Sequence, residues 1–173
     1  MPPCRGAIAC ALVYSLVMTV DVAAEWNLRL AQASPVDVLR AAWDEFGSDA
    51  AVAFSGAEDI ALLGLMRDAG VRFPVFALDT GRLHAETYRL FEAVRSQLDI
   101  PLEVFVPQAD TVQALVAAKG LFSFYVDGHT ECCSVRKVEP LRRALAGRRA
   151  WITGQRRDQS LDTRAHLPLV QPD

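Results

Sequence analysis

The sequence predicts an α/β fold in which an open, mostly parallel sheet carries helices on both faces. Three observations favour this class. Short apolar runs of strand length alternate with longer segments of helical periodicity. Glycines or short polar turns separate these segments. The composition, with 51% hydrophobic and 23% charged residues among 173, is typical of one globular domain with a sizeable core.

The clearest helix begins after Ser34. This serine is a favourable N-cap, Pro35 suits the first turn, and Asp37 completes a capping box. Apolar residues continue at helical spacing as far as Phe46, and Gly47 ends the helix.

The remaining elements alternate along the chain. Apolar runs predict strands over residues 50–54, 73–78, 102–106 and 150–153. Helical periodicity predicts helices over residues 59–70, 85–98 and 110–119, and a last one through 138–145 that ends at Gly147. Because strand and helix alternate, we expect parallel strands with ligands bound outside their carboxyl ends.

The first 17 residues are interpreted as an apolar extension. Either the start is over-extended and Met18 is the true first residue, or the segment resembles a signal peptide with a cleavage site at 22–24. The apolar stretch 7–20 is too short to span a membrane comfortably. We therefore assign the folded domain to residues 18–173.

Net charge bears on the binding partners of the protein, and cysteine content bears on its redox compartment. A net charge of −3 provides no basic field, so we expect no nucleic-acid partner, and we expect no membrane association. The four cysteines form two unlike pairs, Cys4 with Cys10 and Cys132 with Cys133, which is not a disulfide framework. This usage indicates a reducing compartment, and we expect the cytoplasm.

Three predicted strands end in polar, glycine-containing loops. The loop at 55–59 has small residues and precedes a helix, which favours binding of an anion. The loop at 79–82 offers a carboxylate acceptor and the guanidinium of Arg82. The loop at 154–160 contains arginines, which suit phosphate-like groups. Together the loops predict a site for a small nucleotide-like anion. The alternative for 55–59 is an ordinary strand-to-helix connection. For 79–82 it is local hydrogen bonding within the turn, and for 154–160 it is a solvated basic turn.

The adjacent thiols Cys132 and Cys133 lie in a polar and aromatic stretch, 120–137. Adjacent cysteines seldom bond to each other, because the intervening peptide would be strained. Cations next to them, including Lys137, favour thiolates that bind metal or do redox chemistry. The alternative is a pair of small buried hydrophobic residues.

Four motifs in order resemble the assimilatory adenylyl-sulfate reductases of the phosphoadenylyl-sulfate reductase family. They are Ser-Gly-Ala-Glu-Asp (55–59), Leu-Asp-Thr-Gly-Arg-Leu-His (78–84), the stretch 120–137 with Glu-Cys-Cys and Arg-Lys, and Gly-Gln-Arg-Arg-Asp-Gln-Ser (154–160). The resemblance covers about residues 20 to 173 and implies an adenine nucleotide alpha hydrolase-like (PP-loop) fold, incomplete at the C-terminus. Ala57 and Ile60 depart from the loop of the ATP pyrophosphatases, which disfavours ATP chemistry.

The resemblance implies reduction of adenylyl sulfate to sulfite and AMP in sulfate assimilation, with thioredoxin or glutaredoxin as reductant. It implies a 4Fe–4S cluster, with Cys132 and Cys133 as two of four ligands. Lys137 would support the reaction electrostatically between cluster and substrate. The substrate pocket would be lined by Ser55, Gly56, Ala57, Glu58, Asp59, Asp79, Thr80, Gly81, Arg82, Gly154, Arg156 and Arg157.

The chain departs from the family pattern because a second cysteine pair and the segment with the nucleophilic cysteine are absent from it. We expect a truncated chain that is inactive alone, with the nucleophile beyond residue 173. The alternatives are a non-catalytic nucleotide-binding remnant of a reductase, a phosphoadenylyl-sulfate reductase, or a structural zinc or redox-sensing role for the cysteine pair. The cysteine pair favours the donor without the 3′-phosphate.

Overall fold

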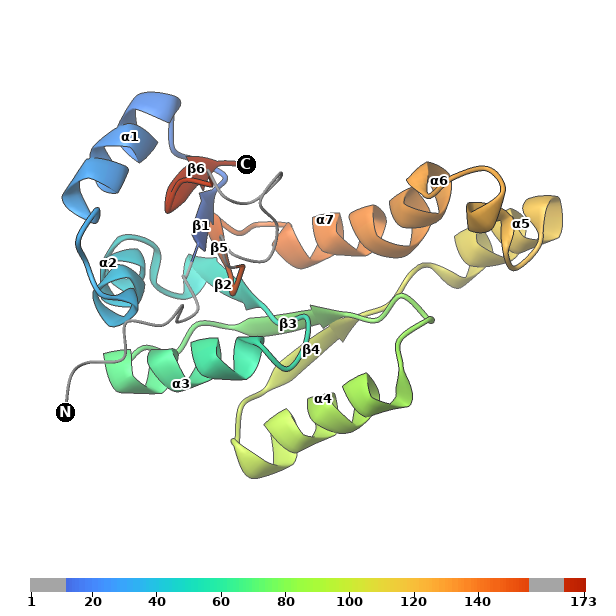
Figure 1. Ribbon diagram of the computed structural model, residues 1–173, viewed down its shortest axis with the longest axis horizontal. Helices are drawn as coiled ribbons and strands as arrows, with labels where there is room; N and C mark the ends of the chain where they lie inside the picture. The colour runs from blue at the N-terminus through green and yellow to red at the C-terminus, as the bar shows by residue number, and fades with distance from the viewer. Residues whose placement is uncertain (1–11, 156–166) are drawn as a thin grey trace. The chain divides into compact units, whose positions relative to one another are not determined.

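The computed structural model describes residues 12–155 and 167–173, and the chain forms two compact units (Figure 1). The first unit consists of Met1–Pro74 and Gly147–Asp173, and the second of Val75–Ala146. In both units short strands alternate with helices, and most strand pairs are parallel. The predicted α/β class is therefore confirmed.

The first unit holds four strands in the order β2-β5-β1-β6. β5 runs parallel to β2, whereas β1 is antiparallel to β5 and parallel to β6. Its elements are β1 (Leu12–Ser15), α1 (Val20–Arg29), α2 (Pro35–Phe46), the 3₁₀ turn Gly47–Asp49, β2 (Ala50–Ala53), α3 (Asp59–Ala69), β5 (Ala150–Thr153) and β6 (Val170–Pro172).

α2 forms as its capping residues predict. The N–H of Asp37 donates to Oγ of Ser34 at 3.2 Å, and Gly47 ends the helix with a φ of +53°. The buried face of α2 contributes Leu39 and Phe46 to a core that also contains Val13, Val52, Phe54, Leu62, Ile152 and Val170. Burial of one such side chain contributes roughly 1.5 to 3 kcal/mol, so this core holds the first unit together.

β1 lies inside the apolar segment 1–17, where the sequence predicted no strand. Val13 is fully buried between β5 and β6, and the ring of Tyr14 stacks on Trp151 with 4.7 Å between centroids. α1 and β6 were also not predicted from sequence. The domain boundary at residue 18 stays a prediction, and residues 12–15 contribute a paired strand to the sheet.

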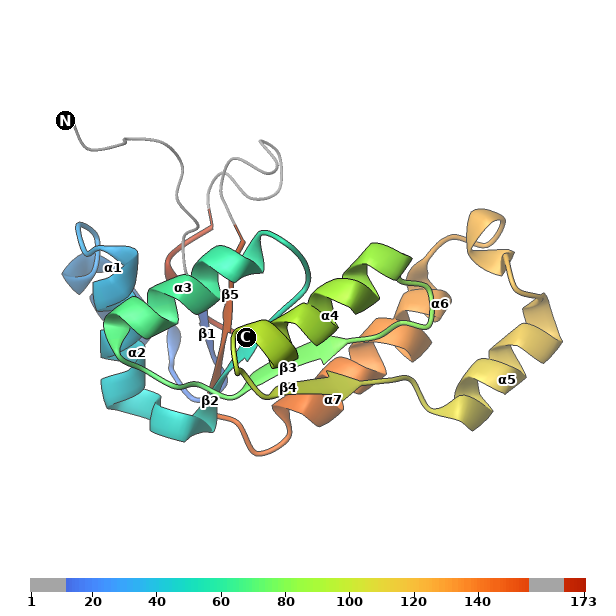
Figure 2. The same cartoon turned by 90° about the horizontal axis from the view of Figure 1, so that it is seen from below.

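The second unit contains the parallel strands β3 and β4 with helices on both faces. α4 and α7 lie on opposite sides of the two strands in both views (Figures 1 and 2). Its elements are β3 (Val75–Leu78), α4 (Ala85–Gln97), β4 (Leu102–Phe105), α5 (Ala109–Lys119), the 3₁₀ turn Ser123–Tyr125, α6 (Thr130–Cys133), the π-helical segment Ser134–Val138 and α7 (Glu139–Leu145).

The last helix of the second unit begins earlier than the sequence predicts. α6, the π-helical segment and α7 follow one another without interruption from Thr130 to Leu145. The cysteine pair therefore lies in the first turn of a continuous helix. A π-helical segment inserts extra backbone into a helix and is frequent at functional sites.

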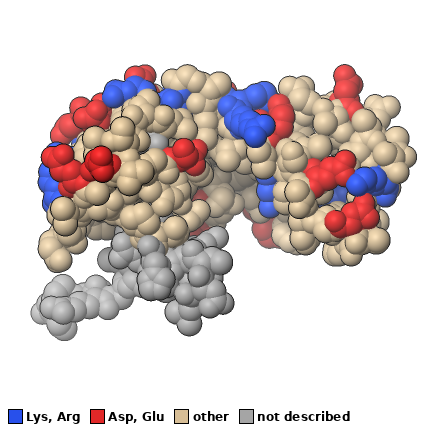
Figure 3. Space-filling model, turned by 90° about the horizontal axis from the view of Figure 1, so that it is seen from above, with Lys and Arg blue, Asp and Glu red and all other residues tan. Residues whose placement is uncertain are grey.

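Acidic and basic side chains are interspersed on the face shown in Figure 3 and form no continuous basic surface there. The expected absence of a nucleic-acid partner remains a prediction. Among the described residues, every helix is too short or too polar to cross a lipid bilayer.

Candidate functional site

The turn after β2 is closed by a buried carboxylate. Asp59, the first residue of α3, is 4% exposed. Its Oδ2 accepts hydrogen bonds from the N–H of Ser55 at 2.6 Å, from Oγ of Ser55 at 2.8 Å and from the N–H of Gly56 at 3.3 Å. The N–H groups of Ser55 and Gly56, which the sequence suggested for a bound anion, thus donate to Asp59 instead.

The start of α3 still offers donors to a ligand. In the part of the chain that the structure describes, the N–H groups of Ala57 and Glu58 have no hydrogen-bond acceptor. They lie at the N-terminus of an 11-residue helix, where the backbone dipoles concentrate partial positive charge. An oxyanion that approaches this turn would contact these two groups.

Gly154 approaches the same turn from the neighbouring strand. β5 and β2 are parallel, so their carboxyl ends lie together, and Gly154 directly follows β5. A Cβ at this position would collide with Oδ1 of Asp59. Glycine is therefore required here for close packing against Asp59, and the predicted substrate contact of Gly154 remains untested. Arg156 and Arg157 lie outside the described residues.

The turn after β3 forms through its own aspartate. Oδ1 of Asp79 accepts from the N–H of Gly81 at 2.7 Å and from the hydroxyl of Tyr88 at 2.9 Å. The hydrogen bond to this carboxylate raises the pKa of Tyr88. This geometry agrees with the local turn bonding that the sequence left as an alternative.

Arg82 packs on aromatic rings of the segment that precedes the cysteines. Its guanidinium lies 4.4 Å from the ring centroid of Phe124 and 5.9 Å from that of Phe122, and it donates to the carbonyl of Leu121. These cation–π contacts fix the side chain at one end of the turn. The contact of Arg82 with an oxyanion remains a prediction.

Arg136, which was not among the residues selected from the sequence, contacts the turn after β3. It lies in the π-helical segment, is 7% exposed, and donates from Nη1 to the carbonyl of Thr80 at 2.8 Å. The neighbouring Lys137, which the sequence analysis selected, is exposed. The sequence carries no signal that separates these two residues, because the π-helical register that buries one and exposes the other has no signature in the sequence.

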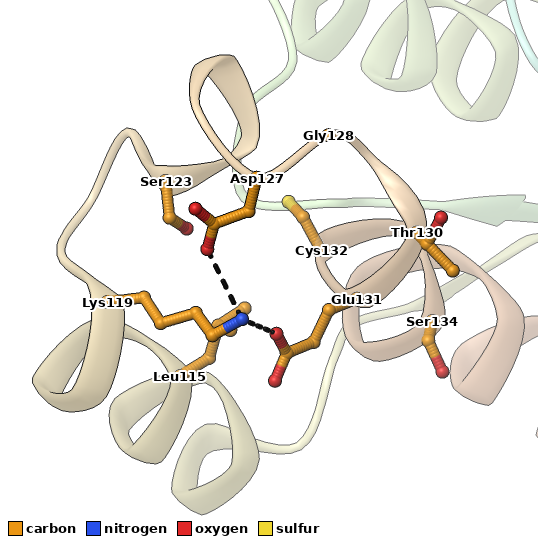
Figure 4. Close-up of a pocket in the computed structure, with 9 residues that line it drawn as sticks. All are labelled: Leu115, Lys119, Ser123, Asp127, Gly128, Thr130, Glu131, Cys132 and Ser134. Carbon is orange, nitrogen blue, oxygen red and sulfur yellow. Dashed lines mark ion pairs between the residues drawn. The ribbon is translucent and has the colours of Figure 1, made fainter.

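The two thiols are free and half-buried on the continuous helix. Cys132 lines a pocket of about 350 Å³, together with Leu115, Lys119, Ser123, Asp127, Gly128, Thr130, Glu131 and Ser134 (Figure 4). The side chains of Lys119, Asp127 and Glu131 point toward one another beside the thiol in Figure 4. Cys132 is thus accessible from this pocket.

An ion-pair cluster surrounds Lys119 at this pocket. Its Nζ lies 2.5 Å from Oε2 of Glu131 and 3.2 Å from Oδ2 of Asp127. Hydrogen bonds to Glu131 and then to Asp127 raise the pKa of Lys119. Two carboxylates therefore compensate the charge of this lysine and link α5 to the start of the cysteine helix.

The predicted iron–sulfur cluster fits the two thiols in part. Cys132 and Cys133 are unbonded and partly exposed, and thiolates are the ligands that such clusters use. Within residues 12–155 and 167–173, no group of three or more His, Cys, Asp or Glu side chains is arranged to hold a metal ion. The described residues thus supply two ligand positions.

The chain is similar in sequence to curated adenylyl-sulfate reductases. The chain is 55% identical over 157 residues to 5'-adenylylsulfate reductase 3, chloroplastic, of Arabidopsis thaliana, covering 91% of this chain and 34% of that protein. It is 51% identical over 144 residues to the adenosine 5'-phosphosulfate reductase of Pseudomonas aeruginosa, covering 83% of this chain and 54% of that protein. The chain thus spans about a third to a half of the length of these curated relatives.

A solved structure confirms the fold. The crystal structure of phosphoadenylyl-sulfate reductase from Candida auris superposes with a TM-score of 0.64 at 22% identity, over 82% of this chain and 70% of that one. Residues 49–173 match the family model of the phosphoadenosine phosphosulfate reductase domain. This match covers most of the sequence, and the chain therefore belongs to the phosphoadenosine phosphosulfate reductase domain family.

Proposed function

We propose that this chain provides the nucleotide-binding part of an adenylyl-sulfate reductase, which converts adenylyl sulfate to sulfite and AMP in sulfate assimilation. The observation that carries the proposal is 55% identity over 91% of the chain to a protein named 5'-adenylylsulfate reductase. The two ordered strand-end turns and the free cysteine pair support it.

The substrate contacts follow from the geometry of each turn. The open N–H groups of Ala57 and Glu58 suit an oxyanion, because the start of α3 carries partial positive charge. The turn at Asp79–Arg82 presents a carboxylate and backbone groups that suit a ribose hydroxyl or a base amino group. We expect Gly154, Arg156 and Arg157 to contact the substrate as well.

The proposed chemistry is nucleophilic substitution at sulfur. A cysteine thiolate of the enzyme attacks the sulfonate sulfur, the bond from that sulfur to the phosphate oxygen breaks, and AMP leaves with the electron pair. A dithiol reductant, thioredoxin or glutaredoxin, then attacks the resulting S-sulfocysteine, becomes a disulfide and releases sulfite. The residues of this chain bind the nucleotide and orient its sulfate.

The cysteine pair belongs to the electrostatics of this site. Cys132 and Cys133 would hold two positions of a 4Fe–4S cluster, whose positively charged surroundings would help to orient the sulfate end of the substrate. Lys137 is exposed beside them and has no ion-pair partner within the described residues. Its free charge is therefore available to the substrate anion.

Calorimetric titration of the 173-residue chain tests the proposal. We expect heat of binding with AMP and with adenylyl sulfate, and weaker binding of adenosine 3′,5′-bisphosphate, because the cysteine pair favours the donor without the 3′-phosphate. Tighter binding of the bisphosphate would instead favour a phosphoadenylyl-sulfate reductase. No heat with any of the three nucleotides would refute nucleotide binding by this chain.

The location of the protein follows the proposed chemistry. Free thiols at the site suit a reducing compartment, and we propose the cytoplasm. The Arabidopsis relatives are chloroplastic by name. Fluorescence microscopy of the tagged protein in its own cells tests this assignment, and an export signal would contradict it.

A further inference from the structure

Arg136 is a buried cation to which the proposed chemistry gives no role. Only 7% of its surface is exposed, and its Nε is buried without an acceptor in the part of the chain that the structure describes. No carboxylate of the described residues forms an ion pair with it. Burial of an unpaired guanidinium is unfavourable because water no longer solvates the charge. The contacts that it makes must offset this cost.

These contacts join two segments of the second unit that are 56 residues apart in sequence. The first is the turn after β3, where Nη1 donates to the carbonyl of Thr80 at 2.8 Å. The second is the helix of Cys132 and Cys133, which carries Arg136 in its π-helical segment. The guanidinium of Arg136 therefore links the turn to the helix of Cys132 and Cys133 through a hydrogen bond.

Gly81 shows how closely the two segments approach. Its φ is +69°, a conformation that side chains rarely adopt, and a Cβ there would lie 3.2 Å from Nη1 of Arg136. The backbone of the turn thus lies directly against the guanidinium. A movement of either segment would be transmitted to the other through this contact.

We infer that Arg136 is a positioning residue that couples the turn Asp79–Arg82 to the helix of Cys132 and Cys133. The inference rests on the proposed function, because it takes the turn as part of the nucleotide site. The two neighbouring cations then have different tasks. Lys137 offers an exposed charge, whereas Arg136 holds the turn at a set position relative to the thiols.

Thiol alkylation measures this coupling directly. Iodoacetamide is added to the reduced chain with and without AMP, at concentrations scaled to the Kd of each variant. Mass spectrometry then gives the rate of modification of the peptide with Cys132 and Cys133. We expect AMP to change this rate at least about fivefold in the wild type, which is a typical magnitude for coupled sites.

Three variants isolate the role of Arg136. Arg136→Met keeps the aliphatic stem of the side chain but removes its charge and donors, and we expect AMP to leave the alkylation rate unchanged. Arg136→Lys restores the charge and a donor group without the planar guanidinium, and we expect part of the AMP effect to return. Arg142→Met removes an exposed arginine of the same helix and should behave as the wild type.

Each outcome decides the inference. A wild-type AMP effect in Arg136→Met overturns it, and so does an AMP effect that is absent from a wild type shown by calorimetry to bind AMP. A wild type that binds no AMP refutes the proposed function as well. Should Arg136→Met not fold, Gly81→Ala displaces the same contact without loss of charge, and a full AMP effect in that variant overturns the inference.

Discussion

The turns after β2 and β3 have similar composition and are held in different ways. The turn after β2 closes on Asp59, which lies within five residues of Ser55 in sequence and is almost fully buried. In the turn after β3, Asp79 accepts a hydrogen bond from the N–H of Gly81. The carbonyl of Thr80 in this turn accepts a hydrogen bond from Arg136, which lies 56 residues away in sequence. The first turn is thus a local structure, whereas the position of the second depends on the cysteine helix.

This difference predicts where each turn is vulnerable. Loss of a local contact should destabilise the first unit and leave the thiols unaffected. Loss of the distant contact should affect the thiols more than the free energy of unfolding.

Asp59→Ala should have the largest effect. The substitution leaves the N–H groups of Ser55 and Gly56 without their acceptor, and it removes hydrogen bonds to a buried charged group. We expect the free energy of unfolding to fall by roughly 3 to 5 kcal/mol. Urea denaturation followed by circular dichroism measures it, with Asp59→Asn as the milder control. A loss below about 1 kcal/mol would show that the turn does not depend on this carboxylate.

Gly154→Ala should follow, because the new Cβ collides with Oδ1 of Asp59. We expect a loss of about 1 to 3 kcal/mol in the free energy of unfolding. Gly64→Ala in α3 is the matched control, since a Cβ there meets no atom within 4 Å and alanine favours helix. In an Asp59→Ala background the cost of Gly154→Ala should largely disappear, and full additivity of the two changes would contradict the contact.

Gly81→Ala should destabilise less, by about 1 to 2 kcal/mol, because it combines a positive φ with a close approach to Arg136. Gly70→Ala separates the two causes, since Gly70 has a φ of +72° and open space around its Cβ position. Thermal unfolding of both variants measures the difference. An equal loss in both would mean that the contact with Arg136 contributes nothing.

Lys119→Met should have the smallest effect on unfolding, because its two ion pairs are partly exposed and screened by salt. The raised pKa of Lys119 means that the folded state binds the proton more tightly than the unfolded state. This stabilisation is therefore present at neutral pH and is lost as the pH rises above the ordinary lysine value of 10.5. Unfolding at several NaCl concentrations tests it, and a salt-independent difference between wild type and variant would argue against the ion pairs.

Local signals in the sequence account for most elements of the fold. The capping box at Ser34 and the glycine at position 47 predicted α2 because the hydrogen bonds involved lie within one turn of chain. β1 and β6 were missed because short strands are specified by their partners, and β1 pairs with residues 135 to 157 positions away. The helix of the cysteine pair was predicted to start too late, because glycine and aromatic residues precede it.

The positions of the candidate site along the chain were predictable from the sequence, but the contacts of its side chains were not. The strand-end positions of Ser55–Asp59 and Asp79–Arg82 followed from the alternation of strand and helix. The engagement of two N–H donors by Asp59 did not follow, since it depends on the exact direction of one side chain. Arg136 could not be told apart from Lys137, because burial of one and exposure of the other depend on the register of the π-helical segment.

Hydrogen–deuterium exchange with adenylyl sulfate tests the central claim, that both strand-end turns bind the nucleotide. We predict slower exchange in peptides that cover 55–59 and 79–82 and unchanged exchange in α4, which should lie outside the site. Slower exchange at only one turn would remove the other turn from the site. Bound ligand with unchanged exchange at both turns would contradict the account.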